Sequence, residues 1–176
     1  MTPTPEQGME LCTVRIGGCM YGVEIHRVCE ILGPSALRPI PLCPEFIAGL
    51  VHYRGEILTA IHLGGILRLG KPAEESSIMV MDAHVPFGLL VDEICEVVAV
   101  TAAQYEPVPC TLGPLCKQIF AGAYKTEAGL IVQLDPAELE PAKLELLYGI
   151  QPGDHLQQMN STNAGQNNSG AMTCAL

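Results

Sequence analysis

The chain contains an internal repeat, and this repeat constrains its fold more than any single motif does. When the 176-residue sequence is shifted by 66 residues, a stretch near the N-terminus falls on a similar stretch in the middle, with its aromatic, Gly, apolar, Cys and Glu positions coinciding. The two stretches are Tyr21-Gly22-Val23-Glu24-Ile25-His26-Arg27-Val28-Cys29-Glu30-Ile31 and Phe87-Gly88-Leu89-Leu90-Val91-Asp92-Glu93-Ile94-Cys95-Glu96-Val97. A second match, at a shift of 73, places residues 58–62 on residues 131–135. The repeat therefore predicts two similar halves, at about residues 9–70 and 76–148.

Short strands joined by turns are expected in each half. Apolar residues alternate with a period of two on both sides of Gly17-Gly18, which predicts a hairpin. A second hairpin is predicted around Arg54-Gly55-Glu56, between strands at about 50–53 and 57–61. The prolines of Arg38-Pro39-Ile40-Pro41 require an extended crossover, and residues 45–50 after Pro44 are expected to form one helical turn.

The second half repeats this order, with strands expected near 78–81, 87–91, 96–100, 120–125 and 130–134. The absence of Trp, together with 18 Gly and 14 Pro, also favours many short strands over a helix bundle. Rolling a sheet into a barrel hides its edges. We therefore expect a mainly β protein of two small barrels that share a seam, with a few short helices.

The charge of the chain excludes some functions. Nine basic residues against 19 acidic ones give a net charge of −10, which disfavours binding to nucleic acid or to anionic lipid. Residues 1–8 resemble no signal peptide and are expected to be flexible, and no apolar run approaches the roughly 18 residues of a membrane-spanning helix. A cytoplasmic protein is expected, with its domain at residues 9–150 and a disordered polar tail at 151–176.

Eight cysteines and five histidines raise the question of a metal or redox site. The cysteines form no CxxC pair and no HExxH motif is present, so we expect the cysteines mainly as small buried side chains and predict no metal and no cofactor. No GxSxG motif occurs, and neither Asp92-Glu93 nor Glu138 with Glu140 forms a convincing catalytic carboxylate pair, so no enzyme is predicted. A thiol-linked or metal-linked sensing role remains the alternative.

The Arg54-Gly55 turn is the one candidate binding feature that the residues themselves indicate. A hairpin would present Arg54 at its tip, where a planar guanidinium can pair with carboxylates or carbonyls of another protein. The alternative is an ordinary solvated charge on a turn.

Several stretches, in the same order and with similar spacing from residue 21 to residue 135, resemble the CheW-like family of chemotaxis coupling proteins. The stretches are Tyr21-Gly22-Val23-Glu24-Ile25; Val28-Cys29-Glu30-Ile31; Arg38-Pro39-Ile40-Pro41; Pro44-Glu45-Phe46-Ile47-Ala48-Gly49; Val51-His52-Tyr53-Arg54-Gly55; Phe87-Gly88-Leu89-Leu90-Val91-Asp92-Glu93; and Gly129-Leu130-Ile131-Val132-Gln133-Leu134-Asp135.

The resemblance implies two five-stranded, SH3-like barrels and a non-catalytic adaptor. In this family one surface binds the regulatory domain of a CheA-type histidine kinase, and a groove near the seam accepts the cytoplasmic tip of a chemoreceptor, in arrays on the inner face of the membrane. Arg54 matches the Arg of the family's Asn-Leu-Arg-Gly turn, and Val28 and Glu30 match its Val-x-Glu-Ile segment. These three are the partner-binding residues that the resemblance implies, with Gly55 and Glu56 as weaker candidates.

The chain departs from the family's pattern at three places. His52-Tyr53 stands where the family has Asn-Leu, and Thr59 stands where it has Pro. The family's Ile-Asp-Leu-Arg is here Ile61-His62-Leu63-Gly64, so two charges are absent. We expect such changes to leave the fold intact and to affect the choice of receptor or kinase.

Overall fold

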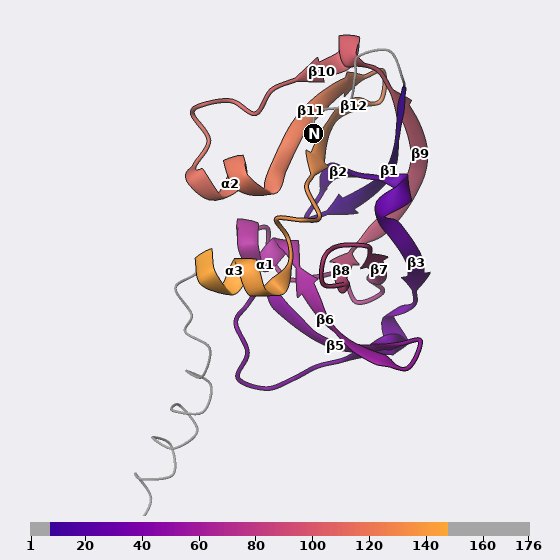
Figure 1. The fold of residues 1–176 in the computed structure, drawn as a ribbon, viewed down its shortest axis with the longest axis vertical. Helices are drawn as coiled ribbons and strands as arrows, with labels where there is room; N and C mark the ends of the chain where they lie inside the picture. Colours follow the sequence, from indigo (N-terminus) through magenta and orange to yellow (C-terminus); the bar gives the residue numbers. More distant parts are fainter. Residues whose placement is uncertain (1–7, 148–176) are drawn as a thin grey trace, which may run out of the picture.

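The computed structural model describes residues 8–147, which form two curled, six-stranded sheets stacked along the long axis of the molecule (Figure 1). The upper sheet of Figure 1 has the order β10 (Tyr105–Glu106), β11 (Phe120–Thr126), β12 (Gly129–Leu134), β2 (Cys19–Glu24), β1 (Met9–Ile16), β9 (Glu93–Val100). The lower sheet has the order β3 (Val28–Leu32), β7 (Ser77–Met81), β8 (Phe87–Val91), β6 (Glu56–His62), β5 (Ile47–Tyr53), β4 (Leu37–Arg38). The expected flexible N-terminus, apart from Gly8, and the expected tail at 151–176 lie outside the described residues.

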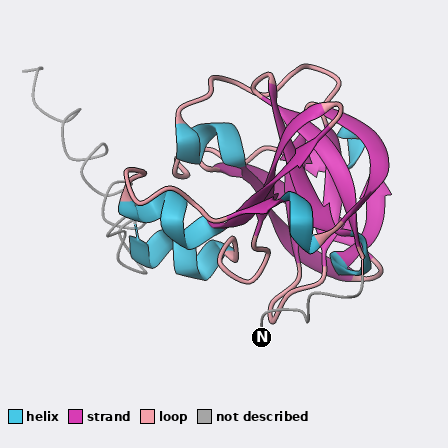
Figure 2. Cartoon of the chain, turned by 90° about the horizontal axis from the view of Figure 1, so that it is seen from above, coloured by secondary structure: helices cyan, strands magenta, loops and turns pink. Residues whose placement is uncertain are grey.

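The mainly β class, two barrels and few helices are confirmed. Each sheet has six strands where the resemblance implied five, because a two-residue strand, β4 or β10, adds to one edge. The helices are short and lie outside the sheets (Figure 2). They are α1 (Leu63–Leu67), α2 (Pro114–Ile119), α3 (Pro141–Leu147) and the single 3-10 turns η1 (Ile25–Arg27), η2 (Pro34–Ala36) and η3 (Ala102–Gln104). No helix of the described residues is long and apolar enough to cross a membrane.

The sequence repeat corresponds to an exchange of hairpins between the two halves. Hairpin β1–β2, from the first half, pairs with β9 and β12 of the second, while β7–β8 of the second pairs with β3 and β6 of the first. Each strand from β1 to β6 has a counterpart six places later, from β7 to β12. When every strand is replaced by its counterpart, the order of one sheet becomes that of the other, read from the opposite edge. Neither half of the sequence therefore forms a complete six-stranded sheet by itself.

Two repeated glycines mark the positions where the exchanged hairpins meet their host strands. Gly22 pairs with Gln133 and Gly88 pairs with Ala60, in the two parallel strand pairs. A Cβ on Gly22 would lie 2.8 Å from Ile131 Cγ2, and one on Gly88 would lie 2.9 Å from Ile78 Cγ2. Both halves have Gly at this position because the neighbouring side chains occupy the space that a Cβ would need.

The main hydrophobic core joins the two sheets. Its fully buried side chains come from the upper sheet, such as Val14 and Ile16, and from the lower sheet, such as Met79 and Leu89. One smaller cluster lies in each sheet, around Leu11 in the upper and around Val51 in the lower. The two barrels therefore share most of their buried apolar surface.

One element prediction was wrong. Residues 45–50 form no helical turn, because β5 begins at Ile47. Only a tight turn precedes it, with the Ile47 N–H donating to the Pro44 carbonyl oxygen at 2.9 Å. Ile47, Gly49 and Val51 are buried in alternation, the period of a strand, and this alternation outweighs the helix-start signal of Pro44.

Candidate functional site

The β5–β6 hairpin presents Arg54 at its tip through a two-residue turn. Arg54 and Gly55 both have positive φ, 49° and 88°, and Tyr53 pairs with Glu56 at the ends of the strands. This is the conformation that tight hairpins require at both central positions, and Gly adopts it without strain whereas Arg rarely does. The turn therefore fixes the backbone of Arg54 at the tip of the hairpin, so that its side chain extends from the outside of the barrel.

Arg54 contacts the strand at the opposite edge of its sheet. Its Nη2 lies 3.3 Å from Oε2 of Glu30 in β3. Because β3 is one edge of the lower sheet and β5 is next to the other, this contact bridges the ends of the curled sheet. The side chain of Arg54 is still 73% exposed, so most of its donors remain accessible to a partner.

The ring of Tyr53 packs against the guanidinium of Arg54. The guanidinium carbon of Arg54 lies 5.0 Å from the centre of the Tyr53 ring, within the range of a cation–π contact. Loss of hydration raises the pKa of Tyr53, and Glu30 adds to this rise while Arg54 opposes it. Tyr53 therefore remains protonated at neutral pH, as a hydroxyl beside an ion pair. In the sequence, Tyr53 stands out only as a departure from the family pattern. An aromatic residue directly before a turn Arg was the signal that could have predicted this contact.

The structure brings four of the five expected site residues together. Arg54, Gly55 and Glu56 form the tip of the hairpin and Glu30 joins them through its contact with Arg54. Val28 also lies in β3 but is half-buried and packs against the main core. The exposed apolar side chains nearest in sequence, Ile31 at 47% and Ile57 at 70% exposed, were not predicted as site residues.

The corresponding tip of the upper barrel carries the opposite charge. At the shift of 73 residues, Glu127 stands where Arg54 is, in the turn between β11 and β12. The counterpart of Glu30, at a shift of 66, is Glu96. The cationic tip is therefore present in one barrel only, and the pseudo-symmetric molecule presents two chemically different ends to its surroundings.

Comparison with known proteins decides the family. The family model described as "CheW-like domain" matches residues 10–142, which is most of the chain. The chain belongs to the CheW-like family. Among curated CheW-like relatives, "Chemotaxis protein CheW" of Treponema pallidum is 25% identical over 145 residues, covering 78% of this chain and 85% of that protein. The protein of the same name in Rhizobium meliloti is 29% identical over 135 residues, covering 73% and 86%.

A solved CheW-like structure agrees with this assignment. The scaffolding protein TtCheW from Thermoanaerobacter tengcongensis matches with a TM-score of 0.67 and 26% identity, covering 78% of this chain and 89% of that one. The sequence resemblance is thus confirmed, as is the fold of SH3-like barrels that it implied. The CheW-like family is a family of non-catalytic scaffolds.

Two of the departures from the CheW-like pattern are packed against each other. His62 is 6% exposed, and a Cβ on Gly64 would lie 2.6 Å from His62 Nε2. The imidazole therefore occupies the space in which a side chain at position 64 would begin. Burial lowers the pKa of His62, while the negative charge of Asp92 opposes this shift. His62 and Gly64 are thus one structural change rather than two.

The cysteines are less buried than the sequence predicted. Of the seven in the described residues, all are free and only Cys12 is buried, whereas Cys19, Cys29 and Cys110 are exposed. Cys29 lies in an edge strand and Cys110 in the loop before α2. Side chains in such places can be exposed to solvent even when they are apolar. Within residues 8–147, no group of three His, Cys, Asp or Glu side chains could hold a metal ion.

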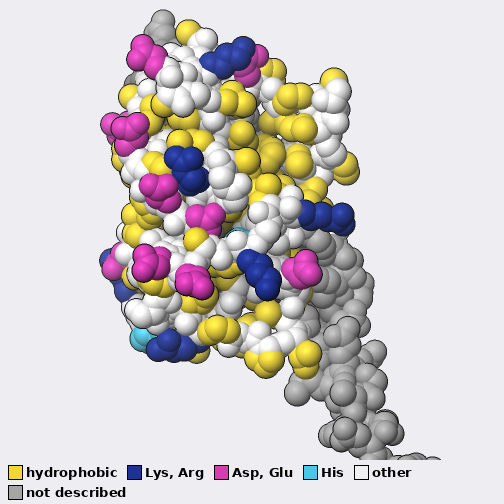
Figure 3. All heavy atoms as spheres, turned by 180° about the vertical axis from the view of Figure 1, so that it is seen from behind, with side chains coloured by type: hydrophobic (Ala, Val, Ile, Leu, Met, Phe, Trp, Pro, Cys, Tyr) yellow, Lys and Arg dark blue, Asp and Glu magenta, His cyan; other side chains and the backbone are white. Residues whose placement is uncertain are grey.

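The face shown in Figure 3 has no basic patch among its described residues. Lys and Arg side chains lie singly, mostly beside acidic ones, and hydrophobic side chains fill much of the remaining surface. Besides Arg54, three Lys or Arg side chains of the described residues are held in ion pairs: Arg15 with Glu93, Lys125 with Glu106 and Lys143 with Glu138. A surface of this kind suits contacts with another protein better than contacts with a polyanion.

Proposed function

We propose that this chain is a chemotaxis adaptor that couples a chemoreceptor to a CheA-type histidine kinase. The observation that carries the proposal is the tip of the lower barrel, where Arg54 is held in a strained turn, stacked on Tyr53 and left 73% exposed. Backbone strain at an exposed charged residue is commonly maintained for a function. Membership of a non-catalytic scaffold family supports a role that depends on surfaces alone.

The receptor tip binds beside Arg54, and the kinase regulatory domain binds another surface of the same molecule. The partner's carboxylate or carbonyl groups take the donors of Arg54 that Glu30 leaves free. A receptor that changes shape on binding its ligand then alters kinase activity through differential binding to this bridge. Because it binds the receptor tip, the protein is located at receptor arrays on the inner face of the membrane.

The test is calorimetric titration of the purified protein with a receptor signalling hairpin and, separately, with the kinase regulatory domain, both from the same organism. Arg54→Ala is expected to weaken receptor binding by about 2 kcal/mol, or about thirtyfold, if Arg54 is a central contact. Binding of the kinase domain should stay unchanged.

Arg15→Ala provides the matched control. Arg15 also forms an exposed ion pair, with Glu93 at 3.1 Å, but in the upper sheet. Removing it should leave the receptor affinity within about twofold of the wild type. Equal losses from the two variants, or a thermal destabilisation of Arg54→Ala as large as its loss of affinity, would show that Arg54 is not the receptor contact.

A further inference from the structure

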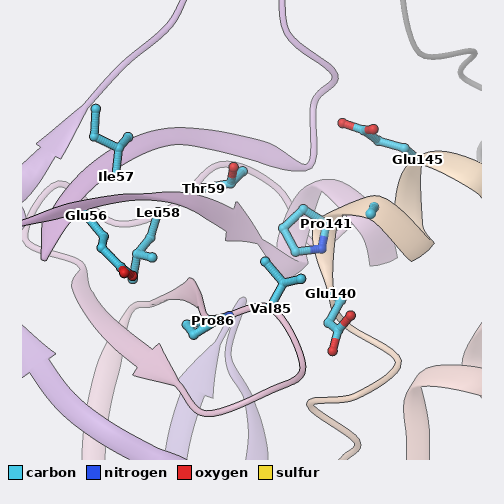
Figure 4. Close-up of a pocket in the computed structure, with 10 residues that line it drawn as sticks. Glu56, Ile57, Leu58, Thr59, Val85, Pro86, Glu140, Pro141 and Glu145 are labelled. Atoms are coloured by element: carbon cyan, nitrogen blue, oxygen red, sulfur yellow. The ribbon is translucent and has the colours of Figure 1, made fainter.

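A groove of about 460 Å³ lies on the side of β6 that does not face β5 (Figure 4). Its walls come from three elements that are distant in sequence: the first half of β6, the turn between β7 and β8, and the start of α3. The lining residues are Glu56, Ile57, Leu58, Thr59, Val85, Pro86, Glu140, Pro141, Ala142 and Glu145. Consecutive residues of β6 point to alternate faces of their sheet, so a groove lined by four in a row follows the edge of the strand.

That edge of β6 has no partner strand in the described part of the chain. β6 pairs with β8 only from Ala60 onward, in the register of Ala60 with Gly88. Extending this register would bring Pro86 beside Leu58, but Pro has no N–H to donate. The strand pairing therefore stops there, and residues 56–59 are paired on the β5 side alone.

The backbone groups on this edge are available for hydrogen bonds. Tyr53 and Glu56 close the two-residue turn as a hydrogen-bonded pair, and such pairs alternate along antiparallel strands. The N–H and C=O of Ile57, opposite His52, therefore point away from β5, and so does the N–H of Thr59, opposite Leu50. Ile57 is 70% exposed, so a strand could approach it without displacing other elements.

The charge of the groove selects the kind of strand that it accepts. Its lining includes three carboxylates, Glu56, Glu140 and Glu145, and no Lys, Arg or His side chain. Glu140 is buried and accepts a hydrogen bond from the His84 N–H at 2.8 Å, so Glu56 and Glu145 carry the accessible negative charge. The nearest cation on α3, Lys143, is held by Glu138 at 2.9 Å. Val85, 54% exposed, and Ile57 supply the apolar contacts. The groove thus combines an open strand edge and apolar side chains with two accessible carboxylates, Glu56 and Glu145.

We propose that this groove binds an extended segment of a partner protein, added to β6 as an extra strand, in which apolar residues alternate with Lys or Arg. Strand addition to an open sheet edge gives affinity through the main chain and specificity through alternate side chains. A second copy of this chain is a poor occupant, because it carries a net charge of −10 and pairing two β6 edges would bring acidic residues together.

The first test uses the full chain, labelled with ¹⁵N, and a synthetic heptapeptide that alternates Val with Lys and Arg. We expect amide shifts at Ile57, Thr59, Val85 and Ala142, and no such shifts with the same peptide carrying Glu in place of its basic residues. Shifts confined to other parts of the molecule would overturn the proposal.

Affinities from fluorescence anisotropy of the labelled peptide provide the second test. Ile57→Pro removes an N–H that points away from β5 and should weaken binding about fivefold. Because Pro also fixes φ near −65°, the Tm of the variant is measured beside its affinity, and a retained Tm shows that the hairpin is intact. The double variant Glu56→Lys/Glu145→Lys should weaken it about tenfold at low salt. The matched control, Glu75→Lys/Glu127→Lys, makes the same charge change at exposed sites outside the groove. It should change log Kd of the peptide by less than half as much as the groove variant does.

Other occupants would give other results. Equal effects of the two double variants would reduce the binding to general charge attraction and overturn the proposal. A second copy in the groove would produce dimers, in sedimentation at increasing concentration, that Ile57→Pro abolishes. The chain's own residues 148–176 in the groove would produce shifts at Ile57 and Thr59 when they are deleted without peptide. Either result would also overturn the proposal. Because the probe is neither receptor nor kinase, these outcomes are independent of the adaptor proposal.

Discussion

Replacing Gly64 by Ala tests whether His62 and Gly64 form one structural unit. A Cβ at position 64 would lie 2.6 Å from His62 Nε2 and 2.8 Å from the Gly70 carbonyl oxygen, well inside an ordinary contact distance. His62 is 6% exposed and has little room to move away. Overpacking of this kind costs about 1–3 kcal/mol, while Ala in place of a helical Gly returns up to about 1 kcal/mol.

The net loss should therefore be about 1–2 kcal/mol in the free energy of unfolding, or about 3–6 °C in Tm. In a His62→Ala background the clash with the ring disappears and only that with Gly70 remains. The cost of Gly64→Ala should then fall by at least half, which corresponds to a coupling energy of about 1 kcal/mol.

Urea unfolding followed by far-UV circular dichroism measures all four members of this cycle, since the chain has no Trp for fluorescence. Additive losses in the double variant would show that the ring does not occupy the space beside Gly64, and would refute the coupling. The same reasoning predicts that Gly64→Arg is tolerated better with His62→Asp, which restores the family's pattern, than alone.

The other predictions concern pH, backbone strain and thiol access. The pKa of His62 is lowered in the folded state, so the unfolded chain binds a proton at a higher pH than the folded chain does. The free energy of unfolding should therefore fall as the pH drops below about 6.5. Tm measured from pH 7.5 to 5 should decline more steeply for the wild type than for His62→Gln. Gly49 has φ of 152° and a Cβ there would lie 2.9 Å from the Arg38 carbonyl carbon, so Gly49→Ala should lose about 2–3 kcal/mol of stability in urea, whereas Gly33→Ala, with open space around it, should change by less than about 0.5 kcal/mol. Thiol labelling of the native chain should modify Cys19, Cys29 and Cys110 before Cys12, whose burial also raises its pKa; metal in the purified protein, or a native disulfide among these thiols, would revive the sensing alternative.

Local patterns in the sequence predicted the strands well, because alternation and turn residues act over a few positions. The hairpin around Gly17-Gly18 and the turn at Arg54-Gly55 are both present as expected. The exchange of hairpins was not predictable in this way, because it depends on the parallel pairing of residues more than 25 positions apart, such as Ala60 with Gly88. The helical turn at 45–50 failed because a single Pro signal competed with strand alternation.

The candidate site was predicted in part for the same reason. The position of Arg54 at a tip follows from local turn chemistry, but its contact with Glu30 requires the sheet to curl until its two ends meet. The family resemblance supplied Glu30 as a candidate, and the ion pair supplies a physical link between the two residues. The groove beside β6 combines three distant segments and left no signal in the sequence.

The hairpin exchange also bears on how such a chain can arise. A polypeptide equivalent to one half would have β1 and β2 that find no place in its own sheet, and a sheet that lacks two of its strands. Two copies would complete each other as a twofold dimer by trading hairpins, in the manner of domain swapping. The present molecule has the topology of such a dimer fused end to end through the segment between α1 and β7. In a fused chain the two copies need not be identical, and here one tip carries the cation of Arg54 while the other carries the carboxylate of Glu127.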